Sequence, residues 1–151
     1  MNTTVVIVSY KSEHLIEENI KSYSENTKII IIENSQNYLL KDRIEKKYKN
    51  VEVILNENSG FAQAANLGAK LTKTENIFFC SPDNFTERDT INKLEDFSKK
   101  LDNEFGILIL SDENECPNTI LPIKETRGML CFFVKKEVFL KELFVFLKKS
   151  W

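Results

Sequence analysis

Short apolar runs alternate with longer amphipathic segments along most of the chain. The runs are rich in Val, Ile and Phe and show little polar alternation, which is typical of strands buried on both faces of a sheet. The segments "TTVVIVS", "KIIIIEN" and "NIFFCS" show this pattern most clearly. The pattern predicts five strands, over residues 3–9, 28–34, 51–55, 76–81 and 105–111.

Between the predicted strands, apolar residues recur every three or four positions, as they do on one face of a helix. This spacing predicts helices over residues 12–24, 38–49, 61–72 and 87–101. Alternating strands and helices with short connections indicate an α/β fold, a three-layer α/β/α sandwich around a mostly parallel sheet. A chain of 151 residues is enough for one such domain, so we expect a single domain over 1–151.

Composition and charge narrow the class of protein. Hydrophobic residues make up 42% and charged residues 29% of the chain, which favours a folded protein over a disordered one. The formal net charge of −2 provides no basic surface of the kind that nucleic-acid binders use, so no nucleic-acid partner is expected. The start "MNTTVVIVSYKS" lacks the basic region of a signal peptide, and no stretch approaches the roughly 20 apolar residues that span a bilayer. We therefore expect a cytoplasmic protein.

Three cysteines, Cys80, Cys116 and Cys131, are widely spaced and accompany no CxxC or histidine-rich motif. A structural zinc site normally shows such ligand spacing in the sequence. Reduced thiols in the core of a cytoplasmic protein are the simpler interpretation.

Polar and backbone-permissive residues follow the first four predicted strands. In open α/β sheets, ligands bind outside the carboxyl ends of the strands, so these residues are candidates for a binding site. The chain contains neither GxxxxGK[ST] nor GxGxxG, which argues against a P-loop and a dinucleotide fingerprint. The candidates are Ser9, Tyr10, Glu33, Asn34, Ser35, Asn58, Gly60, Ser81 and Asp83.

Each candidate also has an ordinary structural interpretation. Gly60 fits either a tight turn or a close approach of backbone to phosphate at a helix N-terminus. Asp83 fits either an exposed loop acid or a hard oxygen ligand for Mg²⁺ or Mn²⁺. Glu33 fits either a solvated carboxylate or a hydrogen-bond acceptor for a nucleobase. Taken singly, the residues leave both interpretations open.

Taken in order, four segments resemble the nucleotide-sugar-binding half of family 2 glycosyltransferases, in particular the rhamnosyltransferase-like branch. The segments are "VVIVSYKSEHLIEENIKSY", "IIIIENSQN", "NENSGFAQAANLGAKL" and "IFFCSPDN", of which the third is the most specific. The resemblance covers residues 4 to 90 well and continues more loosely to about residue 140, through "RGMLCFFVKKEVFLKEL". It implies a GT-A (Rossmann-like) fold, with a nucleotide-sugar-binding part over 1–101 and a partial acceptor-side part over 102–151.

The resemblance also implies roles for individual residues. Ser9 and Tyr10 would border the nucleoside, and Glu33 occupies the place of an Asp that bonds the base in the family. Gly60 and Asn66 would shape the start of the helix beside the nucleoside and phosphates, together with Gly68. The implied nucleotide-sugar-binding set is Ser9, Tyr10, Glu33, Asn34, Ser35, Asn58, Gly60, Asn66, Ser81 and Asp83.

Asp83 matches the last acid of the family's metal motif, which holds a divalent ion on the diphosphate. Ser81 stands where a full DxD motif has its first acid. A single carboxylate is chemically sufficient for Mg²⁺ or Mn²⁺, because substrate phosphates and water fill the remaining positions. The resemblance thus implies a divalent cofactor, Mg²⁺ or Mn²⁺, held by Asp83.

The implied activity is inverting transfer of a sugar from a UDP-, dTDP- or GDP-linked donor to a hydroxyl of a glycan or lipid-linked acceptor, in polysaccharide synthesis. The family's general base comes from an acidic "ED" segment beyond "VF", but here "FVFLKKSW" follows and no acidic residue comes after Glu142. The catalytic base therefore stays unassigned. A non-catalytic nucleotide-sugar-binding module, or a remnant or split half of an enzyme, is the alternative. A nucleotidyltransferase would usually carry a glycine-rich loop after the first strand, and "SYKSEH" has no glycine.

Residues 136–151 combine a wide apolar surface with lysines. A helix that docks on the sheet and completes the core is one interpretation. A helix lying on a membrane surface or on a partner protein is the other, because such helices pair a broad apolar face with lysine. The second interpretation would place the protein at the inner face of the membrane.

Overall fold

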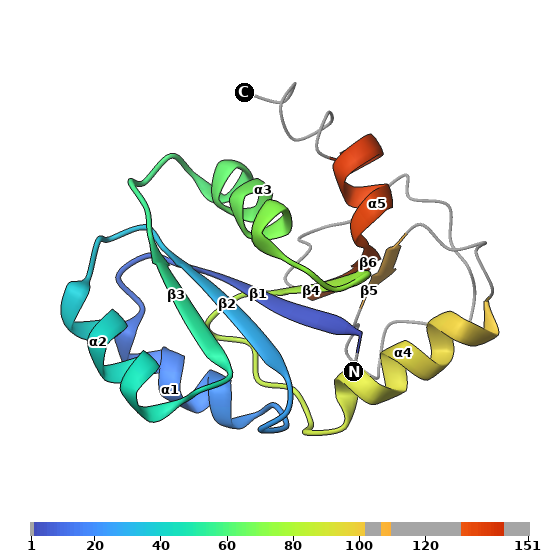
Figure 1. Cartoon of the computed structure of the whole chain (residues 1–151), viewed down its shortest axis with the longest axis horizontal. Helices are drawn as coiled ribbons and strands as arrows, with labels where there is room; N and C mark the ends of the chain where they lie inside the picture. Colours follow the sequence, from blue (N-terminus) through green and yellow to red (C-terminus); the bar gives the residue numbers. More distant parts are fainter. Residues whose placement is uncertain (1, 102–106, 110–130, 144–151) are drawn as a thin grey trace.

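The computed structural model describes residues 2–101, 107–109 and 131–143, and these form a sheet between two layers of helices (Figure 1). The sheet has six strands in the order β3-β2-β1-β4-β6-β5. The strands are β1 (Thr3–Ser9), β2 (Lys28–Glu33), β3 (Val51–Leu55), β4 (Asn76–Cys80), β5 (Ile107–Ile109) and β6 (Cys131–Lys135). The five strands that the sequence predicts are all present, the fifth over its described residues.

Helices cover both faces of the sheet, which confirms the predicted three-layer α/β/α sandwich. In Figure 1, α1, α2 and α4 lie against one face, whereas α3 and α5 lie against the other. The helices are α1 (Glu13–Lys21), α2 (Tyr38–Lys47), α3 (Phe61–Leu71), α4 (Thr90–Lys100) and α5 (Lys136–Val138), followed by a π-helical turn η1 (Phe139–Leu143).

The sheet is parallel over β1 to β4, and β6 runs antiparallel between β4 and β5. The sequence did not predict β6, although "CFFVK" is an apolar run. The partner of β6 is β4, and paired positions such as Cys80 and Cys131 are 51 residues apart in the chain. Local periodicity carries no information on such a pairing.

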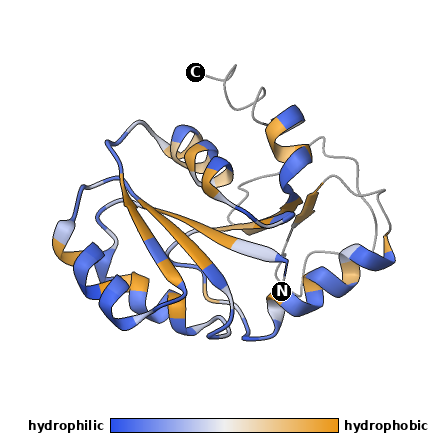
Figure 2. Cartoon of the chain, in the orientation of Figure 1, coloured by the Kyte–Doolittle hydropathy of each residue, from blue (hydrophilic) through white to orange (hydrophobic). Residues whose placement is uncertain are grey.

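Alternate residues of the strands pack on opposite faces of the sheet, and Figure 2 shows the central strands as the most hydrophobic part of the chain. On the side of α3, Phe79 stacks on Phe132 with ring centroids 4.7 Å apart and contacts Phe139 at 4.8 Å. Phe139 is fully buried, so the described start of the C-terminal segment docks on the sheet. Residues 144–151 lie outside the described part of the chain, and the expected membrane or partner contact is not tested.

Within the described residues, no helix is long and apolar enough to cross a membrane.

Helix α3 approaches the sheet closely at Gly68. A Cβ at this position would lie 2.4 Å from Cγ1 of Val6 in β1, a distance that the packing cannot accommodate without a shift. Gly68 lies in the second half of α3, and its close approach to Val6 shows that it faces the sheet. Its expected role at the start of the helix is wrong, because its missing side chain serves helix–sheet packing.

The outer edge of β3 is covered by two side chains of α2. Lys41 Nζ donates a hydrogen bond to the carbonyl oxygen of Val53, and the backbone N–H of Val53 donates to Glu45 Oε1 at 2.8 Å. Lys41 and Glu45 also pair with each other at 2.7 Å, one turn apart on the helix.

Candidate functional site

The carboxyl ends of the parallel strands meet at one edge of the sheet. Ser9 at the end of β1 is paired in register with Glu33 at the end of β2, and Glu33 is paired with Leu55 of β3. Backbone hydrogen bonds extend this alignment beyond the strands, from Asn34 N to Ser9 O at 2.8 Å and from Asn56 N to Glu33 O at 2.9 Å. Because β1 lies between β2 and β4, the strand order switches direction next to β1, where open α/β sheets bind ligands.

The carboxylate of Glu33 organises the loop between β2 and α2. It is 1% exposed and accepts hydrogen bonds from Ser35 N at 3.1 Å and from Asn37 N at 2.7 Å. Ser35 Oγ in turn accepts from Lys11 N at 2.6 Å, which ties this loop to the one after β1. The expected contact of Glu33 with a nucleobase stays a prediction, and the structure gives its carboxylate a separate role in fixing the loop.

Glu33→Gln is expected to lower the free energy of unfolding by about 1–3 kcal/mol, because the neutral amide loses a charge-assisted acceptor and turns a donor toward backbone N–H groups. Urea unfolding followed by circular dichroism measures the change. Glu57→Gln, on an exposed side chain of the next loop, is the matched control and should match wild type. Equal stability of both variants would contradict a loop-fixing role for Glu33.

The loop between β3 and α3 is joined to the β2 loop through asparagine side chains. Asn56 Nδ2 donates to Asn34 Oδ1 at 2.8 Å, and Asn58 Oδ1 accepts from Gly60 N at 3.3 Å. Gly60 has φ 87° and ψ 168°, a conformation that is essentially restricted to glycine. A Cβ at Gly60 would meet nothing within 4 Å, so the requirement for glycine is one of backbone conformation and the backbone is open on this side.

Two candidate residues have buried polar atoms without a hydrogen-bond partner among the described residues. These atoms are Ser9 Oγ, in a residue that is fully buried, and Asn66 Oδ1, in the second turn of α3. Buried polar atoms are nearly always paired, since an unpaired one costs about 1–3 kcal/mol. Tyr10, which follows Ser9, is by contrast 48% exposed at the same edge.

The loop after β4 carries Asp83 and is held by a side chain of α1. Asn19 is fully buried, and its Nδ2 donates to the carbonyl oxygens of Asn84 at 2.6 Å, Ser81 at 3.2 Å and Pro82 at 3.3 Å. Asp83 itself is exposed on this loop. The helix thus fixes the backbone around Asp83, whose side chain is exposed among the described residues.

Sequence reasoning missed Asn19, although the sequence contains a signal. Asn19 lies within the apolar stripe of its helix, beside Ile16, Ile20 and Tyr23, all of which are buried. A polar side chain on a buried face needs hydrogen-bond partners in the fold. Its position therefore indicated a structural contact, but nothing local identified the loop after β4 as the partner.

The described residues contain no group of three or more His, Cys, Asp or Glu side chains that could enclose a metal ion. Asp83 is a single exposed carboxylate on a fixed loop. This donor set suits a hard divalent ion that takes most of its ligands from phosphate and water, and it does not suit a protein-enclosed site.

Comparison with known proteins identifies the fold and the family. The sequence model of "Glycosyl transferase family 2" matches residues 4–144. The structure is similar to residues 1–349 of S. aureus TarS, with 15% identity and a TM-score of 0.67 over 93% of this chain and 48% of TarS 1–349. TarS 1–349 has also been solved with UDP-GlcNAc, and this complex matches with 14% identity and a TM-score of 0.68 over 93% and 47% of the two chains.

A third similar structure is the mannosyltransferase PcManGT from Pyrobaculum calidifontis in complex with GDP-Man and Mn²⁺, with 14% identity and a TM-score of 0.71 over 93% of this chain and 46% of PcManGT. No curated protein sequence matches the chain. The chain spans about half the length of these solved structures, and at such low sequence identity the structural similarity establishes the fold alone. The sequence match, which extends over nearly the whole chain, shows that the chain belongs to glycosyl transferase family 2.

Proposed function

We propose that the carboxyl edge of β1 to β4 binds a nucleotide-diphosphate sugar, and that the chain takes part in transferring the sugar to an acceptor hydroxyl. The observation that carries this proposal is the convergence of four polar loops at the switch in strand order, where Ser9 Oγ and Asn66 Oδ1 are buried and have no hydrogen-bond partner within the described part of the chain. The bound UDP-GlcNAc of TarS and GDP-Man of PcManGT lend it support, since both proteins share this fold.

In this proposal, different loops contact different parts of the nucleotide-sugar donor. Ser9 and Tyr10, with Asn34 and Ser35, border the nucleoside, and Glu33 positions the backbone amides of that loop. On the other side of the ligand, the start of α3 presents backbone N–H groups to the phosphates, since a helix N-terminus favours anions. Three residues shape that surface, namely Asn58, Gly60 and Asn66.

Asp83 would hold a divalent ion, Mg²⁺ or Mn²⁺, for the diphosphate, and Ser81 contributes to the same loop. Such an ion, when bound, neutralises the charge that develops on the departing nucleotide. Asn19 keeps the loop in place through three carbonyl oxygens. Inverting transfer to the acceptor also requires a general base, for which the described residues offer no assignment.

A nucleotide-sugar-binding module without turnover is the second candidate. It stays open because the described residues offer no assignment for the general base that transfer to an acceptor requires. The two candidates share the donor site and differ only in whether the sugar leaves the nucleotide.

Calorimetric titration of the folded chain with UDP, dTDP and GDP, each with and without Mn²⁺, tests the donor site. One nucleotide is expected to bind in the presence of Mn²⁺ and to lose most of its affinity without it. Absence of binding by all three to a chain shown to be folded would overturn the proposal. Release of nucleotide from the matching nucleotide sugar, on addition of glycan acceptors, then separates the transferase from the binding module.

A further inference from the structure

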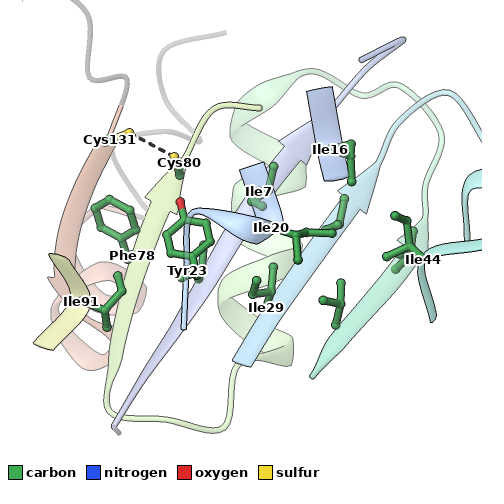
Figure 3. Packing of buried hydrophobic residues seen from close by; sticks show 14 of the residues in the cluster. Ile7, Ile16, Ile20, Tyr23, Ile29, Ile44, Phe78, Cys80, Ile91 and Cys131 are labelled. Atoms are coloured by element: carbon green, nitrogen blue, oxygen red, sulfur yellow. Dashed lines mark hydrogen bonds between the residues drawn. The ribbon is translucent and has the colours of Figure 1, made fainter. Parts of the chain in front are cut away.

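We propose that Cys80 and Cys131 form a reversible disulfide that controls the loop carrying Asp83. The two cysteines are paired across β4 and β6, and their Sγ atoms are 3.2 Å apart. Both are free and buried (Figure 3). They are the last residue of β4 and the first of β6, so the pair lies directly below the ligand edge of the sheet.

The backbone already has the separation that a disulfide needs. Residues that face each other in an antiparallel pair have Cα atoms about 4.5 or 5.5 Å apart, and both values fall within the range of roughly 4.4–6.8 Å found for disulfides. The bond length is about 2.05 Å, so closing it from 3.2 Å moves the sulfurs together by roughly 1 Å. Rotation of the two side chains is enough to bring the sulfurs together when the strands are spaced as in a regular antiparallel pair.

The surroundings distinguish the two thiols. Hydrogen bonding with Cys131 lowers the pKa of Cys80, and the same contact, together with burial, raises the pKa of Cys131. Tyr23 packs edge-on against Phe78 and directs its hydroxyl toward Cys80 (Figure 3). Burial raises the pKa of Tyr23, so this hydroxyl stays protonated beside the sulfur. Cys80 is therefore the more acidic thiol of the pair.

The reaction is exchange with a small-molecule disulfide such as oxidised glutathione, which reaches the buried thiols when this end of β4 and β6 opens locally. Cys80 thiolate attacks one sulfur of the reagent, forming a mixed disulfide and releasing one thiol. Cys131 then loses its proton, attacks Cys80 Sγ and releases the second thiol. The protein dithiol gives up two electrons and two protons, the reagent disulfide is reduced to two thiols, and a reduced thiol reverses the reaction.

The disulfide changes the loop because Cys80 Sγ contacts its backbone. The sulfur lies 3.4 Å from the carbonyl oxygen of Ser81 and 3.5 Å from that of Asn84, so its single S–H proton can be donated to either end of the Asp83 loop. Oxidation removes the thiol proton and draws the sulfur toward β6. Asn19 is then left to hold the loop, and the Asp83 carboxylate is less firmly placed.

Incubation of the full chain in glutathione buffers of increasing oxidation, followed by alkylation and peptide mass mapping, tests the disulfide. A linked Cys80–Cys131 peptide is expected, together with the loss of two free thiols and their return on reduction. Cys116→Ser should keep the link and Cys131→Ser should lose it. Persistence of both free thiols in fully oxidised buffer, or linkage through Cys116 instead, would overturn the proposal.

The proposed control of the Asp83 loop by the disulfide rests on the proposed nucleotide site. It is tested by a separate measurement, the affinity for the nucleotide. Mn²⁺-dependent affinity for the nucleotide is expected to fall about threefold or more on oxidation, which corresponds to the loss of one weak hydrogen bond. Equal affinity of the reduced and oxidised chains would overturn the control of the loop. If neither form binds a nucleotide, the proposed function fails, and the mass mapping still decides whether the disulfide forms.

Discussion

Asp83→Ala is expected to abolish the Mn²⁺ dependence of nucleotide binding, with a loss of affinity of at least about 100-fold in the presence of the ion. Groups that act on a metal only through its ligands already change metal affinity by about 10–100-fold, and Asp83 is proposed as the ligand itself. Calorimetric titration of the variant with the nucleotide that wild type prefers, with and without Mn²⁺, measures the effect.

The exposed position of Asp83 allows an effect on binding to be separated from an effect on folding. Its side chain is exposed, so alanine should change the free energy of unfolding by no more than about 0.5 kcal/mol. Glu87→Ala is the matched control, since Glu87 is an exposed acid four positions along that pairs with Lys93 at 2.8 Å. If Asp83→Ala retains Mn²⁺-dependent binding, the metal is held elsewhere and the assignment of Asp83 is incorrect.

Asn19→Ala is expected to lower the free energy of unfolding by about 2–4 kcal/mol and to weaken Mn²⁺-dependent nucleotide binding. The substitution leaves a cavity at a fully buried position and removes the donor shared by the carbonyl oxygens of Ser81, Pro82 and Asn84. Urea unfolding and nucleotide titration on the same preparation measure the two effects.

Two further variants separate the hydrogen bonds of Asn19 from its volume. Asn19→Asp keeps the shape but points an acceptor at three carbonyl oxygens, so it should destabilise at least as much as alanine. Glu18→Ala, on the exposed neighbour in the same helix, should behave as wild type. Loss of stability with unchanged affinity would mean that the loop reaches its binding conformation without Asn19.

The edge of the sheet that carries the site was predictable because parallel strands align their carboxyl ends. Once the apolar runs ending at Ser9, Glu33 and Cys80 are recognised as strands, their following residues must meet at one edge. The antiparallel strand β6 was not predictable in the same way. Its pairing with β4 depends on contacts between distant positions, and neither helical nor strand periodicity encodes them.

The direction in which individual side chains point could not be predicted from the sequence either. Glu33 ends its strand as predicted, but its carboxylate turns back to the amides of Ser35 and Asn37, a geometry set by the loop conformation. Gly68 gave no sign that it faces Val6, because glycine serves equally in turns and in close packing. Tertiary packing decides these details after the local pattern has fixed the strands.

The pairing of Lys41 and Glu45 with Val53 has a consequence for self-association. An exposed edge strand offers free N–H and carbonyl groups to which another chain can add, as in β-augmentation and amyloid growth. At β3, the helix of the same chain already uses both polar groups of Val53. Burial raises the pKa of Glu45, but hydrogen bonds from Lys41 and Val53 outweigh it and hold the pKa below its usual value. The carboxylate therefore stays charged down to acidic pH, and at Val53 the β3 edge keeps its backbone groups away from a second copy of the sheet until that charge is lost.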